Sequence, residues 1–260
     1  MNVFIATDLE GISGVCSLSH IFDPKDEGYR AARHSLAVDT NTAVRAAYDA
    51  GAEHVYVNDG HAGGGNIDPT ELDPRATLVK IADVPPIMSS LDAVVFIGSH
   101  AMSGTQRAFL DHTQSSSTIH RYLYNGKEIG EMTQAGTYFG HFGVPCVAIS
   151  GDRAACEEAK TVFGKSIETA EVKYANERNV AVCLDEDEAQ RAIYQAVKKG
   201  LENRAAVPPL SVTLPLQITV EFQLTSHCDA ACQAPSVERL DGFSARSVKT
   251  KIETFWDVLL

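Results

Sequence analysis

The stretch VFIATDLEG, residues 3–11, begins as a run of apolar residues and ends with two acidic residues and a glycine. Similar apolar runs follow at residues 54–58, 93–97 and 145–149, and segments of helical periodicity separate them. Short buried strands that alternate with helices are typical of an α/β fold with a parallel sheet. The sequence therefore predicts an α/β fold, with a mainly parallel sheet flanked by helices.

The segments around these runs carry helix and turn signals. Helices are expected at residues 28–50, 131–142, 152–163 and 185–204, from apolar spacing and from caps such as Asp152 and Gly51. Asn125-Gly126 lies between two β-rich flanks and predicts a hairpin, because both residues tolerate the positive φ of a tight turn.

The consecutive prolines Pro208 and Pro209 cannot continue a helix and suggest a linker. A further strand is expected at residues 216–222. We therefore expect an α/β metal-binding catalytic domain over residues 1–205, followed by a smaller C-terminal α+β subdomain over residues 206–260.

Composition excludes several classes of partner. The formal net charge of −12 repels phosphate backbones and anionic membranes, so nucleic acid and membrane surfaces are not expected partners. No run reaches the roughly 18 apolar residues of a membrane helix, and the start of the chain lacks a secretion signal. The six cysteines form no C-x-x-C pair. A cytoplasmic protein with reduced thiols is expected.

Residue types that bind metals follow the predicted strands. Asp8 and Glu10 end the first strand, His61 follows the second, and His100 follows the third. The carboxyl ends of parallel strands meet at one edge of a sheet, so these side chains can converge there. Glu131 opens the helix after the hairpin and can face the same crevice. Each residue alone has a simpler explanation as a cap or a solvated loop residue, so the prediction depends on their combination.

The chemistry of this set favours a divalent metal. Asp8 and Glu10 are two residues apart, which places both carboxylates on one face of an extended strand. Two such carboxylates repel each other unless a cation lies between them. Imidazole and carboxylate ligands without thiolates suit zinc, manganese or cobalt.

These motifs resemble the zinc-dependent D-aminopeptidase family. The resemblance is carried by D-L-E-G-I-S-G (8–14), V-N-D-G-H (57–61), F-I-G-S-H-A (96–101), D-H-T (111–113), N-G-K-E-I-G-E (125–131) and V-A-I-S-G-D (147–152). It implies that two zinc ions are bound, with Asp8 as the bridge, and that His112 is the catalytic residue. The implied zinc ligands are Asp8, Glu10, His61, His100 and Glu131.

The resemblance also implies a substrate and an assembly. The expected substrates are short peptides or amides with a free N-terminal residue of D-configuration, such as D-Ala-D-Ala. The expected assembly is a ring-shaped homodecamer whose sites face an inner chamber. His112 could transfer protons to the leaving amine or act as the nucleophile, and the sequence leaves both roles open.

Two other functions remain as alternatives. The first is a magnesium-dependent phosphatase of the haloacid-dehalogenase type, whose first strand also ends in an acidic motif. Glu10 stands where that pattern has Asp, Ile12 stands where it has Thr, and the two histidines stay unexplained. The second is a non-catalytic metal- or peptide-binding module in which the same ligands stabilise the fold.

Overall fold

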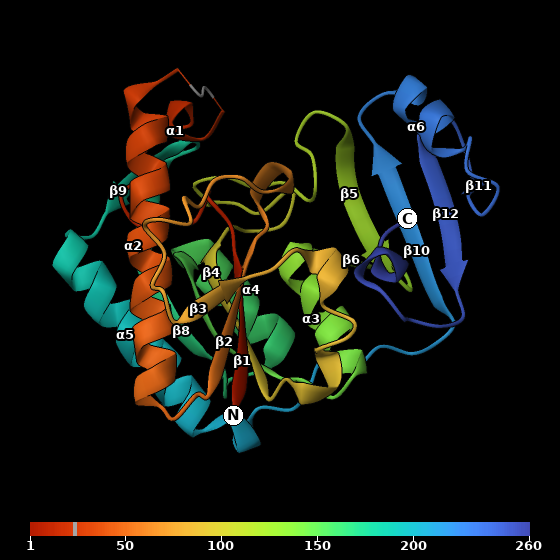
Figure 1. Cartoon of the computed structure of the whole chain (residues 1–260). Coiled ribbons are helices and arrows are strands. Elements are labelled where there is room, and N and C mark those ends of the chain that lie inside the picture. Colours follow the sequence, from red (N-terminus) through yellow and green to blue (C-terminus); the bar gives the residue numbers. More distant parts are fainter. Residues whose placement is uncertain (23–24) are drawn as a thin grey trace.

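The computed structural model describes residues 1–22 and 25–260, which form two β-sheets with helices packed against them (Figure 1). The larger sheet has seven strands in the order β3-β2-β1-β4-β7-β8-β9. Its strands are β1 (Asn2–Thr7), β2 (His54–Asp59), β3 (Ala76–Leu78), β4 (Ala93–Ser99), β7 (Cys146–Asp152), β8 (Glu168–Glu177) and β9 (Val180–Cys183). All neighbouring strands are parallel except β8 and β9.

The smaller sheet has five antiparallel strands in the order β11-β12-β10-β5-β6. These strands are β5 (Ile119–Tyr124), β6 (Lys127–Ile129), β10 (Leu216–Phe222), β11 (Glu238–Arg239) and β12 (Ser244–Lys249). The predicted Asn125-Gly126 turn joins β5 to β6, and both turn residues have positive φ. The boundary expected after residue 205 stays a prediction, but sheet pairing crosses it, because β5 pairs with β10.

Helices cover both faces of the large sheet. The α-helices are α1 (Ser19–Phe22), α2 (Glu27–Asp49), α3 (Glu131–His141), α4 (Arg153–Phe163), α5 (Glu186–Glu202) and α6 (Thr225–Ala231). The 3₁₀ helices are η1 (His61–Gly63), η2 (Ile81–Asp83), η3 (Met88–Ser90), η4 (Arg204–Ala206) and η5 (Phe255–Val258). Within the described residues, no helix is both long and apolar enough to span a membrane.

The core has two parts, one on each face of the large sheet. Successive side chains of β1 belong to different parts. Val3 and Ile5 pack with α2 and α5, whereas Phe4 packs with α3 and α4. The second part also contains Tyr122 and Ile218 from the smaller sheet, so α3 packs between the two sheets (Figure 1). The predicted fold, a mainly parallel sheet flanked by helices, is therefore the observed one.

One expectation about the cysteines is wrong. Cys16, in the loop after β1, forms a disulfide with Cys183 of β9, across a sequence separation of 167 residues. Cysteine spacing could not reveal this pair, because the two segments meet only when β8 and β9 complete the sheet edge. The four other cysteines are free, and Cys146, Cys156 and Cys228 among them are buried.

Candidate metal centre

The predicted metal ligands meet at the carboxyl edge of the large sheet. β1 lies between β2 and β4, and Thr7 at its end is level with Asp59 of β2 and Ile97 of β4. Asp8 follows Thr7 directly, and Glu10 comes two residues later. His61 follows β2, His100 follows β4, and Glu131 is the first residue of α3. The parallel arrangement therefore brings together side chains from four separate segments.

Close backbone contact between two of these segments requires glycine. The Gly11 N–H donates to the Gly98 carbonyl over 2.8 Å, and Gly98 has φ +81°. A Cβ atom at Gly11 would lie 2.0 Å from the Ser99 carbonyl oxygen. No other residue type fits such an approach, so glycine here allows Glu10 to lie beside the end of β4.

The carboxylates and imidazoles lie within metal-binding reach of one another. His61 Nδ1 lies 2.8 Å from Glu10 Oε2 and 3.3 Å from Asp8 Oδ1. His100 Nε2 lies 3.5 Å from Asp8 Oδ2 and 3.3 Å from Glu131 Oε1. Two potential ligand sets result, Asp8 with Glu10 and His61, and Asp8 with His100 and Glu131. Because both contain Asp8, one bridging carboxylate could serve two ions.

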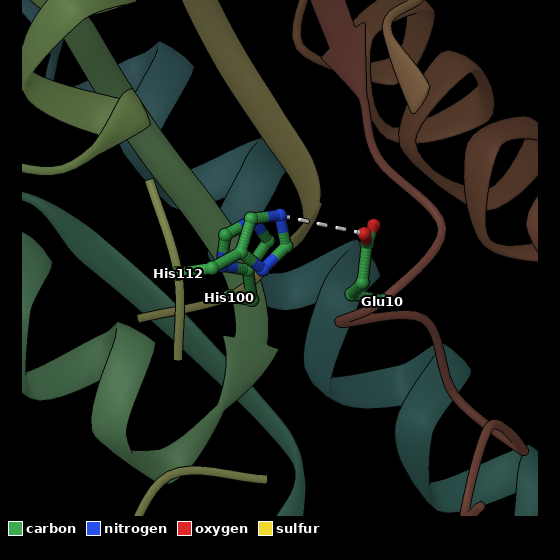
Figure 2. A group of neighbouring side chains, drawn as sticks. All are labelled: Glu10, His100 and His112. Atoms are coloured by element: carbon green, nitrogen blue, oxygen red, sulfur yellow. Dashed lines mark ion pairs between the residues drawn. The ribbon is translucent and has the colours of Figure 1, made fainter. Parts of the chain in front are cut away.

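His112 lies beside this cluster, in the loop between β4 and β5. Its ring stacks on His100 at a centroid distance of 4.2 Å, and both rings face the carboxylate of Glu10 (Figure 2). His112 Nε2 is 3.7 Å from Glu131 Oε1 and 4.0 Å from Glu10 Oε1. A third potential ligand set therefore joins His112 to Glu10 and His100.

The two stacked histidines differ in the hydrogen bonding of their second ring nitrogen, Nδ1. Histidines that bind metals usually donate their other N–H to an oxygen acceptor, which fixes the tautomer. His100 Nδ1 lies 3.0 Å from the Ala101 carbonyl oxygen, so His100 Nε2 is free to bind a metal. His112 Nδ1 is buried and has no hydrogen-bond partner in the described part of the chain. This difference favours His100 over His112 as a metal ligand.

The pKa shifts in this cluster indicate a site that favours positive charge. Burial and the neighbouring Asp8 raise the pKa of Glu10 to about 7. Burial disfavours charged His61, but its hydrogen bonds to Asp8 and Glu10 outweigh this and raise its pKa to about 10. His100 is also buried, yet its contacts with Glu131 and Asp8 hold its pKa well above the usual value. Protons here supply the positive charge that divalent ions would otherwise provide.

His112 behaves differently. Burial, and then the nearby positive charge of His100, lower the pKa of His112 to about 4. Its imidazole is therefore neutral at pH 7 in the metal-free site. The whole group opens into a cavity of about 1300 Å³, which the six site residues help to line.

A buried lysine holds the segment that carries Glu10. Lys173 of β8 is fully buried, and its Nζ lies 4.4 Å from the centre of the Phe109 ring. The ammonium donates to the carbonyl oxygens of Glu10 (2.5 Å), Ile12 (2.9 Å) and Val15 (2.8 Å). All three N–H donors of the ammonium are thereby used. β8 thus fixes the backbone of the loop that follows β1.

Replacing Lys173 with methionine should destabilise the protein and weaken metal binding. The change leaves three carbonyl groups without their donor, and an unsatisfied buried polar group costs roughly 1–3 kcal/mol. Loss of the buried charge offsets part of this, so we expect the free energy of unfolding to fall by about 3 kcal/mol. Denaturant unfolding and zinc titration would measure the two effects.

A matched control is Lys199→Met, because the Lys199 side chain is 63% exposed and pairs with Glu168. Such a pair contributes about 0–1 kcal/mol, so this variant should unfold nearly as the parent does. Equal stability and equal zinc affinity for the two variants would contradict the role given to Lys173.

The structure brings together every residue that the sequence singled out for this site: Asp8, Glu10, His61, His100, His112 and Glu131. Sequence reasoning missed two contributors. Lys173 sits in a strand with no motif, and no local signal could have identified it. The second is Gln114, whose backbone N–H donates to Glu131 Oε1 over 2.7 Å and whose φ is +67°. Its position directly after D-H-T was the one sequence signal for this contact.

Known proteins resemble this chain along its whole length. Residues 1–260 match the model of peptidase family M55, which is described as D-aminopeptidase. A D-aminopeptidase of Bacillus subtilis (strain 168) is 26% identical over 257 residues, which cover 96% of this chain and 92% of that protein.

A solved structure has the same fold. It is the Zn-dependent D-aminopeptidase DppA from Bacillus subtilis, described as a self-compartmentalizing protease. It matches with a TM-score of 0.92 at 23% identity, covering 99% of this chain and 95% of that one. The family inferred from the motifs at residues 8–14, 57–61 and 96–101 is thereby confirmed: this chain belongs to the D-aminopeptidase family.

Proposed function

We propose that this protein is a two-zinc aminopeptidase that removes an N-terminal residue, of D-configuration, from short peptides or amides such as D-Ala-D-Ala. The observation that carries the proposal is the pair of ligand sets that share Asp8 within one open cavity. The Bacillus subtilis relatives support it, since one is named a D-aminopeptidase and the other a Zn-dependent D-aminopeptidase.

The residues present fit two zinc ions. Asp8, Glu10 and His61 would hold one ion, and Asp8, His100 and Glu131 the other. Oxygen and imidazole ligands suit zinc, and three ligands per ion leave a position for water or substrate. The bound pair would polarise the scissile carbonyl and activate a water molecule.

The side chains around the ions would supply the remaining chemistry. The neutral Nε2 of His112 would accept a proton and pass it to the leaving amine, which needs one to depart. Glu131 would be kept in position by the N–H of Gln114.

The assembly and location are part of the same proposal. The Bacillus subtilis structure is described as self-compartmentalizing, which supports a closed assembly with the sites facing an inner chamber, and the family resemblance proposes ten copies in a ring. Such a ring would operate in the cytoplasm and restrict access to short peptides. Light scattering at micromolar protein concentration would measure the mass, and a monomer would contradict the ring while leaving the metal site unaffected.

The alternative functions fit the geometry less well. An aspartyl-phosphate mechanism with magnesium gives no role to His61 and His100, yet both contact the carboxylates directly. A purely structural metal would be enclosed by its ligands, whereas this group lines an open cavity.

Substrate turnover by zinc-loaded protein would test the proposal. We expect hydrolysis of D-Ala-D-Ala and of D-alanyl p-nitroanilide, little hydrolysis of the L-alanyl compound, and none of p-nitrophenyl phosphate. Removal of zinc by a chelator should abolish the activity, and added zinc should restore it. Full peptidase activity in metal-free protein, or turnover of the phosphate ester alone, would overturn the proposal.

A further inference from the structure

The cavity that holds the candidate metal ligands continues along an apolar wall. α3 starts at Glu131, and Ala135 and Phe139 follow four and eight residues later. Residues at this spacing lie on one face of a helix. All three line the cavity, so the helix that carries a metal ligand also leads from the ligand cluster to apolar surface.

Two other segments complete this apolar region. Leu78 and Ile81 line the cavity at the end of β3 and in η2, and Trp256 lines it from η5. Leu78 is 41% exposed and Trp256 is 58% exposed. Single exposed apolar residues are common on soluble proteins, but these meet in the cavity that contains the reactive groups. We name Leu78, Ile81, Ala135 and Trp256 the apolar wall, and the buried Phe139 lies behind it.

We infer that the apolar wall binds an apolar side chain of the peptide substrate, so that peptides with a Leu- or Phe-sized residue beside the scissile bond are preferred to D-Ala-D-Ala. This inference rests on the proposed peptidase function. The peptide is the occupant that fits, because the wall is continuous with Glu131 and the cavity of about 1300 Å³ exceeds the roughly 300–1,000 Å³ of a typical small-ligand site.

The size of the preference follows from burial. Each extra methylene placed in an apolar pocket improves binding roughly 4-fold when it is fully buried. A leucine side chain adds three carbons to alanine, but part of the wall stays in contact with water. We therefore expect kcat/KM for a leucine-containing dipeptide to exceed that for D-Ala-D-Ala by about tenfold.

The fluorescence of Trp256 would report whether a peptide occupies the apolar wall, because Trp256 is the only tryptophan in the sequence. The zinc-loaded protein would be titrated with D-Ala-D-Ala, D-Ala-D-Leu, D-Leu-D-Ala and D-Ala-D-Glu while tryptophan fluorescence and hydrolysis are followed. At least one leucine peptide should change the fluorescence and be cleaved faster than D-Ala-D-Ala, whereas D-Ala-D-Glu should do neither. The better leucine isomer would tell which side of the scissile bond meets the wall.

Substitutions in the apolar wall and elsewhere on the surface would show whether the wall causes the preference for leucine peptides. Trp256→Ser and Leu78→Ser should each lower the ratio of kcat/KM for the better leucine peptide to that for D-Ala-D-Ala, by about threefold of the expected tenfold preference. Phe142→Ser and Val180→Ser are matched controls, since Phe142 is 42% exposed, Val180 is 47% exposed, and neither lines the cavity. These controls should leave the ratio unchanged.

The outcomes distinguish this inference from the proposed function. If all four dipeptides are cleaved at similar rates without a fluorescence difference, or if the controls change the ratio as much as the wall variants do, the apolar subsite is refuted and the peptidase stands. If no peptide is cleaved, the proposed function fails. The fluorescence titration then still tests whether the apolar wall binds leucine peptides. A response to leucine peptides alone would support the subsite, and equal or absent responses would refute it.

Discussion

His112→Ala is expected to keep about two zinc ions per chain while its kcat for D-alanyl p-nitroanilide falls by roughly 10²- to 10⁴-fold, the range for loss of a general acid or base. The reason is the position of the ring. Nε2 of His112 faces Glu10 and Glu131, but Nδ1 has no partner among the described residues to orient it as a ligand. Elemental analysis and steady-state kinetics on the same preparation would measure both quantities.

A conservative variant sharpens this test. His112→Gln keeps a polar side chain of similar reach but cannot cycle a proton, so its kcat should be as low as that of the alanine variant. If His112→Ala instead loses zinc in proportion to its activity, the third ligand set, with Glu10 and His100, is the real one. If kcat is unchanged, His112 takes no part in the reaction.

The ligand cluster could be predicted from sequence because it depends on local signals and one topological rule. Each candidate ligand comes within a few residues of a strand end or a helix start, where acidic residues or histidines stand near glycines. β1 lies between β2 and β4, so the ends of the three strands are adjacent. Apolar runs identified these strands, and the carboxyl-edge rule then placed Asp8, His61 and His100 together.

Other parts of the site depend on contacts between distant segments, which periodicity does not report. β8 contains Lys173 among alternating apolar and polar residues, and its function as the anchor of residues 10–15 appears only after the sheet forms. The Cys16–Cys183 disulfide joins the same loop to β9 for the same topological reason. The smaller sheet is also only partly predictable, because β7, β8 and β9 separate β5 and β6 from β10 along the chain.

His61→Ala is expected to have a larger effect than any of the substitutions above, with loss of at least one zinc ion and nearly all activity. His61 Nδ1 is the closest imidazole atom to the carboxylates, at 2.8 Å from Glu10 and 3.3 Å from Asp8. Its removal takes away a ligand of the zinc ion that would reduce the repulsion between the buried Glu10 and the half-buried Asp8. The fall in kcat/KM should exceed the roughly 10²- to 10⁴-fold loss expected for His112→Ala, and so also the roughly 10- to 100-fold cost of changing a partner outside the ligand shell.

His54→Ala is the matched control, because β2 starts at the exposed His54 and ends just before His61. The control should bind about two zinc ions and keep parental kcat/KM, since His54 is at the opposite end of the strand from the carboxyl edge. Zinc content by elemental analysis, with circular dichroism to establish folding, would compare the variants. If His61→Ala retains both ions while its kcat falls, and His112→Ala loses zinc, the roles of the two histidines are exchanged. The stacked pair His100 and His112 would then be the ligands, and His61 would be the residue that moves protons.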